Sequence, residues 1–383
     1  MCSDFTNGQA GVHRRRWVAA AVASLVMALA LPAAAIDLES AYRAASENDA
    51  AIRASRAAAD ASRERLPQAR AQRLPNVSLN AARTHNDLTS NTQNALGRPV
   101  VNRSQYMSGS ETLVVRQPLY RPFLNSLVNQ AQAQVEEADA SLERDEQSLV
   151  TRVAEAYFDA LLAHDQLSLI AAQKATYSTQ LDAARKLFAG GAGVRTDVDE
   201  AQARLDLTMA QELEAQQNVE FTRHRIGVLT GQPVESLALL DVSRFAPVSP
   251  VPASLEAWIE RAEQSSPEMA ALRAQLEAAR LEVEKTQAGH RPTLDLVAQW
   301  SRTNSDSVTS VNSRYDNKTV GLQLSVPLYA GGYVSSTVRQ AVAAEVRARE
   351  ALEATRRDLG VRVHREFRGM TEGVLRIAAL EQA

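Results

Sequence analysis

Residues 123–188 contain neither glycine nor proline. As one α-helix, these about 66 residues would be roughly 100 Å long at 1.5 Å per residue, which is wider than a globular core. In the second half of the stretch, apolar residues recur at alternating spacings of four and three, which is typical of a coiled-coil seam. A single amphipathic helix packed on its own globule is the less favoured alternative. The seam consists of Leu149, Val153, Ala156, Ala160, Ala163, Leu167, Ile170, Lys174, Tyr177, Leu181, Ala184 and Phe188, and only Lys174 is not apolar.

A glycine-rich segment follows this stretch. The helix is predicted to end at residues 189–193 (AGGAG), to restart at Thr196 or Asp197 and to run to about Leu229. A glycine-rich stop and a polar restart predict an antiparallel helical hairpin with its tip near 189–198. Thr196 with Asp199, or Asp197 with Glu200, would cap the returning helix.

The tripeptide Pro-Leu-Tyr occurs twice and marks a long internal repeat. Each copy has the order helix, proline, strand, polar loop, strand, proline, helix, so one architectural unit is used twice. Pro67 predicts a kink in the first helix of the first copy only. Residues 230–254 carry several prolines and are predicted to link the repeats. The prolines at the expected strand–helix turns are Pro75, Pro118, Pro292 and Pro327.

The predicted strands alternate apolar and polar residues, as in 294–301 and 320–326. Such alternation is typical of outer-membrane barrel strands, although a soluble sandwich would show the same pattern. Residues 84–110 and 301–318 are rich in Asn, Ser and Thr and are predicted to be loops facing outside the cell. Tyr120, Tyr329 and Trp300 lie near strand ends, where they either meet the lipid interface or pack at the turns.

Four strands can be counted in all, and four strands cannot close a barrel in lipid. If these strands span a membrane, several copies of the chain must share one barrel. Three copies would supply twelve strands, and their helical hairpins would form one tube beneath it.

The N-terminal residues indicate export. Three arginines, an apolar stretch over 17–31 and three alanines predict a signal peptide over residues 1–35, cleaved after Ala35. A membrane anchor is the alternative. Cys2 precedes the apolar stretch, so we expect no lipid anchor and a mature chain without cysteine. No other apolar run is long enough for a transmembrane helix.

The sequence offers no catalytic constellation. The formal charge of −3 and the scattered basic residues do not suggest a nucleic-acid partner, and we expect none. No metal-binding or nucleophile motif is present, and we expect neither an enzyme nor a cofactor. The histidines that follow the predicted signal peptide are scattered: His85, His164, His224, His290 and His364.

Four stretches carry a resemblance to a known family: residues 156–161 (AYFDAL), the tip 191–198, residues 289–296 (GHRPTLDL) and residues 327–332 (PLYAGG). In their order and spacing the chain resembles the TolC family of outer-membrane efflux and type I secretion channels. The resemblance implies a mainly α fold with a small membrane β part: a homotrimer with a twelve-stranded β-barrel in the outer-membrane lipid and a long α-helical tunnel in the periplasm. It further implies a passive duct that docks a periplasmic adaptor and an inner-membrane ABC or proton-driven pump. The adaptor-docking residues that it implies are Gly191, Thr196, Asp197 and Val198.

Alignment of the two repeats gives the expected domain organisation. The first repeat spans 36–250 and the second spans 251–383. When Pro118 is matched to Pro327, Ala383 falls opposite Lys174, so we expect a chain truncated within the second long helix, without the second tip and its gate residues. A periplasmic coiled-coil adaptor or scaffold is the alternative function. The sequence does not indicate the cargo.

Overall fold

The computed structural model describes residues 35–241, 248, 250–307 and 310–382. The predicted signal peptide therefore lies outside the described residues, apart from Ala35. Two compact units form, each from two segments of the chain: one from residues up to 53 with 146–246, the other from 54–145 with 247–383. The elements are α2 (Leu38–Asn48), α3 (Ala50–Arg63), α4 (Arg65–Ala71), β1 (Asn76–Gln93), β2 (Pro99–Tyr120), α5 (Phe123–Ala189), α6 (Arg195–Thr230), α7 (Leu255–Ser265), α8 (Pro267–Gln287), η2 (Ala288–His290), β3 (Thr293–Ser307), β4 (Ser310–Ser325) and α9 (Tyr333–Glu381).

The long glycine- and proline-free stretch forms one helix, as predicted: α5 has 67 residues. In the first unit, its seam residues Leu149, Val153 and Ala156 are almost completely buried. In the same unit α6 buries small residues seven apart, Thr208, Ala215 and Thr222, which is the repeat of a coiled coil. Lys174 interrupts the apolar seam, and its ammonium group pairs with Glu212 at 2.6 Å.

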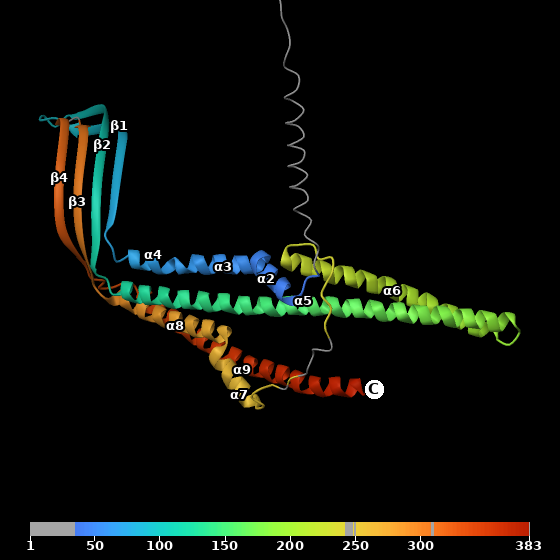
Figure 1. Ribbon diagram of the computed structural model, residues 1–383. Helices are drawn as coiled ribbons and strands as arrows, with labels where there is room; N and C mark the ends of the chain where they lie inside the picture. Colours follow the sequence, from blue (N-terminus) through green and yellow to red (C-terminus); the bar gives the residue numbers. More distant parts are fainter. Residues whose placement is uncertain (1–34, 242–247, 249, 308–309, 383) are drawn as a thin grey trace, which may run out of the picture. The chain divides into compact units, whose positions relative to one another are not determined.

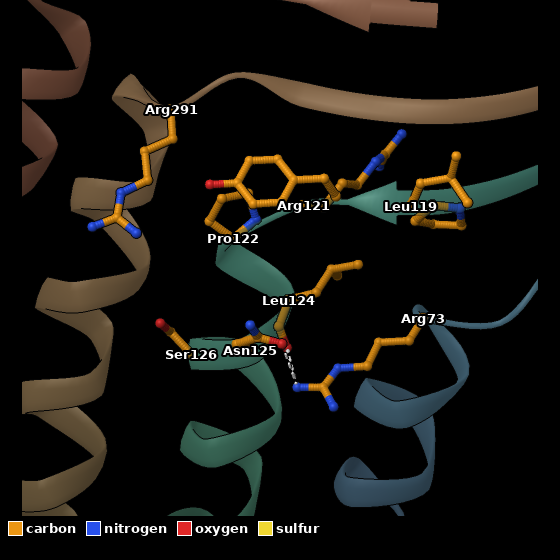
Figure 2. A pocket seen from close by; sticks show the side chains of 10 residues that line it. Arg73, Leu119, Arg121, Pro122, Leu124, Asn125, Ser126 and Arg291 are labelled. Carbon is orange, nitrogen blue, oxygen red and sulfur yellow. Dashed lines mark hydrogen bonds between the residues drawn. The ribbon is translucent and has the colours of Figure 1, made fainter. Parts of the chain in front are cut away.

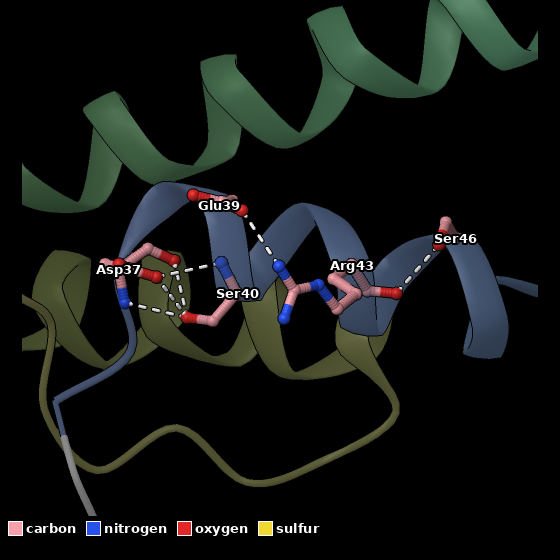
Figure 3. Close-up of polar contacts among 5 residues, drawn as sticks. All are labelled: Asp37, Glu39, Ser40, Arg43 and Ser46. Carbon is pink, nitrogen blue, oxygen red and sulfur yellow. Dashed lines mark hydrogen bonds and ion pairs between the residues drawn. The ribbon is translucent and has the colours of Figure 1, made fainter.

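The first unit also contains α2 and the residues that follow α6. The Asp37 carboxylate accepts a 2.8 Å hydrogen bond from Ser40 N, and Ser40 Oγ accepts one from Asp37 N, which forms a capping box (Figure 3). The hydrogen bonds that Ser40 Oγ and Ser40 N donate to the Asp37 carboxylate hold the pKa of Asp37 below its usual value. In the second repeat Ser254 Oγ accepts a hydrogen bond from Ala257 N and caps α7, but Ala257 has no side-chain group that could return a hydrogen bond. Both repeats therefore begin with a side-chain N-cap, and the reciprocal capping box belongs to the first.

A proline interrupts the helix before the first strand in only one copy of the repeat, as predicted. Pro67 lacks an N–H, and its ring collides with the carbonyl four residues earlier, that of Arg63. The first repeat breaks there, because α3 ends at Arg63 and α4 begins at Arg65. The second repeat has Glu284 at the matching position, and α8 continues through it to Gln287.

The second unit contains one antiparallel sheet with the order β1-β2-β3-β4, whose strands lie side by side in Figure 1. The prediction of loops over 84–110 and 301–318 was wrong. The ladder continues from Thr84 opposite Ser108 to Gln93 opposite Pro99, and β3 and β4 pair as far as Ser307 opposite Ser310. Antiparallel pairing satisfies the backbone whatever the side chains are, so polar residues that face water on both sides still form strands.

The register sorts the side chains of the sheet onto two faces. One face carries apolar residues in successive rows, such as Leu79 with Leu113 and Trp300. The opposite face carries polar residues, such as Asn80 with Thr112 and Ser301. On the apolar face, Leu322 and Leu324 of β4 remain about two-thirds exposed.

No helix among the described residues is long and apolar enough to cross a bilayer.

The end of α6 provides a test of the packing in the first unit. Gly231 has φ of +70°, and a Cβ placed on it would lie 2.9 Å from Asn48 Cβ. We expect Gly231→Ala to destabilise the protein by about 1–3 kcal/mol, through backbone strain and overpacking. Urea unfolding followed by helical circular dichroism measures this change.

Gly360→Ala is the matched control. Gly360 lies inside α9 with open space around it, so alanine there should stabilise the protein by about 0.5–1 kcal/mol. Equal unfolding midpoints for the two variants would contradict this account of Gly231.

Candidate functional site

The hairpin tip is held by backbone hydrogen bonds. At the end of α5, Gly190 N and Gly191 N donate to the carbonyls of Lys186 and Phe188 at 3.0 Å. Gly191 then has φ of +74°, the left-handed conformation that glycine adopts without strain. Gly193 is needed for space, because a Cβ there would lie 3.1 Å from Phe188 N. The tip is therefore a tight turn with one defined backbone path.

The predicted side-chain caps of the returning helix were wrong. The N-cap of α6 is Val194, without a side-chain cap hydrogen bond. Thr196 and Asp197 lie inside the first helical turn rather than at the flanking position, because the turn closes earlier, with Asp197 N donating to the Val194 carbonyl. Asp197 still places a negative charge near the positive end of the helix dipole. Of the predicted tip residues, Gly191, Thr196 and Asp197 are exposed and Val198 is half-buried.

An exposed apolar surface at the tip was not predicted from the sequence. Leu187, Phe188 and Val194 are each about half exposed. Phe188 was assigned to the seam by its spacing, but α5 ends one residue later, so no further turn of helix covers it. The tip therefore presents a small apolar surface around the glycine turn. The sequence pattern that could have indicated this surface is apolar residues directly beside the glycine-rich segment that ends the helix.

The four predicted turn prolines lie at or near strand ends. Pro75 and Pro292 directly precede β1 and β3, and Pro327 follows β4 by two residues. Pro118 lies inside β2, next to a shift in the register between Pro118 and Tyr120. Proline cannot donate to a ladder, so it suits a bulge where pairing is already interrupted.

A buried ion pair joins the strand β3 to the start of α5. Asp295 is only 5% exposed, and Arg121 Nε donates to its Oδ1 at 2.7 Å, while Arg121 Nη2 contacts Oδ2. Arg116 adds a weaker contact at 3.9 Å. The side-chain hydrogen bond to Asp295 raises the pKa of Arg121 above its ordinary value. This two-bond geometry fixes orientation as well as distance.

Polar side chains also join neighbouring helices of the second unit. Gln130 of α5 donates to Glu282 of α8 at 2.7 Å, and Lys285 donates to Gln130 at 2.9 Å. Burial opposes the ionisation of Glu282, but the hydrogen bonds from Lys285 and Gln130 outweigh it and lower the pKa of Glu282. Among the described residues, no group of three or more His, Cys, Asp or Glu side chains is placed to hold a metal ion.

The chain is similar in sequence to proteins of known family. The profile of the outer membrane efflux protein family matches residues 41–232 and 258–380, that is, most of both repeats. The alkaline protease secretion protein AprF of Pseudomonas aeruginosa is 36% identical over 310 residues, which cover 80% of this chain and 64% of AprF. The proteases secretion protein PrtF of Dickeya chrysanthemi is 31% identical, with 92% of this chain and 76% of PrtF covered.

Among solved structures, the fold is similar to the outer membrane protein VceC of Vibrio cholerae. The TM-score is 0.72 at 18% identity, over 90% of this chain and 82% of VceC. The helical hairpin and the four-stranded sheet thus have the fold of this outer membrane protein. The chain belongs to the outer membrane efflux protein family, which confirms the family predicted from the sequence. It spans just under two-thirds of AprF and about three-quarters of PrtF.

The ion pair of Asp295 gives a prediction at this site. Asp295→Ala leaves Arg121 without its partner at a position where that arginine is only about a quarter exposed. We expect a loss of about 2–3 kcal/mol in the free energy of unfolding, less than for a fully buried pair. Thermal or guanidinium unfolding measures it.

The control is Asp159→Ala, which breaks a pair with Arg225 whose two side chains are about half exposed. Such surface pairs contribute less than about 1 kcal/mol. If both variants lost the same stability, the Asp295 pair would have no special role in joining β3 to α5.

Proposed function

We propose that the chain serves as the outer-membrane exit duct of a type I secretion system, a passive conduit that docks a periplasmic adaptor and, through it, an inner-membrane pump. The family match over both repeats carries this proposal. The names of AprF and PrtF concern protease secretion, which favours secreted proteins over small drugs as cargo. An ABC pump is the partner that fits this choice.

The sheet supports an assembly of three copies. It has an apolar face and a polar face, and its outer strands β1 and β4 each have one neighbour within the described sheet. Because all neighbours are antiparallel, β4 of one copy can pair with β1 of the next. Twelve strands from three copies would close a barrel with apolar side chains toward lipid and polar ones toward the lumen.

The tip supports the docking role. It combines a fixed backbone turn at Gly191 with exposed Leu187, Phe188 and Val194. An apolar patch of this kind on a rigid turn suits contact with another helical hairpin, whose side chains could pack around the glycines. Asp197 and Arg195 at the start of α6 would add polar contacts at the rim.

Export complementation tests the duct and its tip together. The chain is produced in cells that hold the AprF-type pump and adaptor but lack their duct, and protease in the medium is measured. We expect protease export from the unchanged chain. Gly191→Arg should lower export at least tenfold, because the long, positively charged side chain would block contact between the tip and the adaptor.

Gly191→Ala is the control, since alanine meets the same strain at positive φ but adds almost no bulk. It should keep most of the export. Both variants should be found as heat-modifiable trimers in outer-membrane fractions. Equal export by the arginine and alanine variants would rule out docking at Gly191, and a chain found only as a soluble periplasmic monomer would rule out the duct.

A further inference from the structure

A hollow of about 390 Å³ lies in the second unit, at the point where β2 passes into α5. Figure 2 shows its side chains, which come from the end of α4, the β2–α5 junction and the residue after η2. Three arginines line it, and no aspartate or glutamate does. The lining residues are Arg73, Pro118, Leu119, Tyr120, Arg121, Pro122, Leu124, Asn125, Ser126 and Arg291.

The arginines leave an excess of positive charge at the hollow. Arg121 is paired with the Asp295 carboxylate behind it. Arg73 has neutral partners, since its Nη2 donates to Asn125 Oδ1 at 2.9 Å and to the Leu124 carbonyl at 3.4 Å (Figure 2). Arg291 is exposed and has no acidic partner among the residues that the structure describes. Arg73 and Arg291 thus both line the hollow without a carboxylate partner among the described residues, which favours an anion.

Apolar surface adjoins the same hollow. Leu119 and Tyr120 line it and are each about half exposed. Tyr120 lies opposite Leu294 in the ladder, so it continues the row of apolar residues that cover one face of the sheet. A ligand that fits here has an anionic group for the arginines and a hydrocarbon part that follows the sheet.

We propose that this hollow binds the phosphate of an anionic phospholipid in the periplasmic leaflet of the outer membrane. The inference rests on the proposed function, which places the strands in lipid and the helices in the periplasm, so that the β2–α5 junction lies at the level of the headgroups. Arginine pairs with phosphate through two hydrogen bonds, and tyrosine at a strand end suits the interface. The acyl chains would lie along Leu294, Leu296 and Leu322. Free phosphate would use only the arginines and leave this apolar surface without a role.

Lipid binding to the purified full-length chain in detergent tests the proposal. Native mass spectrometry measures the dissociation constants of phosphatidylglycerol and of phosphatidylcholine with the same acyl chains. We expect phosphatidylglycerol to bind at least fivefold more tightly. Arg291→Gln should weaken its binding about fivefold, the effect of one basic residue near a charged membrane surface.

A second pair of variants separates charge from folding. Ser126 lines the hollow, and Ser126→Asp places a negative charge in it, whereas Ser126→Asn adds a side chain of the same size without charge. The aspartate variant should bind phosphatidylglycerol at least fivefold more weakly than the asparagine variant. Arg376→Gln removes an exposed arginine of α9 outside the hollow and should change nothing.

Equal affinity for the two lipids, or equal binding by the two Ser126 variants, would overturn the proposal. Displacement of the lipid by millimolar inorganic phosphate would also overturn it, since the hollow would then be a site for a free anion. Outer-membrane fractionation keeps this inference separate from the proposed function: a chain that fractionates as a trimer there but shows no preference among lipids contradicts only the lipid site.

Discussion

Backbone hydrogen bonding in the sheet is the constraint on which the rest of the structure depends. Every strand is paired antiparallel over most of its length, yet β1 and β4 have one neighbour each within the described sheet. A backbone N–H or C=O group without a hydrogen-bond partner is unfavourable inside a protein, away from water. It is also strongly unfavourable in lipid, where no water can replace the missing partner. In the proposed membrane location, with one apolar face exposed as well, the sheet would be stable only when other strands continue it. The proposed assembly would meet this requirement of the sheet.

Side-chain contacts at the ends of the strands hold the adjoining helices of the second unit. Asp295 of β3 holds Arg121 at the start of α5, and Gln117 of β2 donates to the Arg73 carbonyl after α4 at 2.9 Å. These contacts fix the direction in which each helix leaves its strand in the second unit. Arg73 and Arg121 belong both to this joint between strand and helix and to the lining of the proposed lipid site.

Much of this fold could be predicted from local sequence. The absence of glycine and proline over 123–188 predicted α5, and Pro67 predicted the break before α4. Prediction failed where tertiary pairing overrides composition: the polar residues from Thr84 onward form strands because their partners in β2 are in register. It also failed at the tip, where backbone bonds start α6 at Arg195 instead of the capping side chains of Thr196 or Asp197. The hollow could not be predicted, because Arg73, Arg121 and Arg291 are distant in sequence and come to line one hollow only in the folded chain.

The most direct test of this account joins the two outer strands of different copies. The described chain has no cysteine, so Ser78→Cys on β1 and Thr319→Cys on β4 can be combined, together with a second pairing of Ser78→Cys with Asn317→Cys to allow for the register between copies. We predict that oxidation of outer-membrane samples gives a ladder of disulfide-linked dimers and trimers on non-reducing gels. A cysteine pair on the inner strands, at Val114 and Gln299, should link only within one chain. Monomers alone from both outer-strand pairs would contradict the claim that copies of this chain complete one sheet.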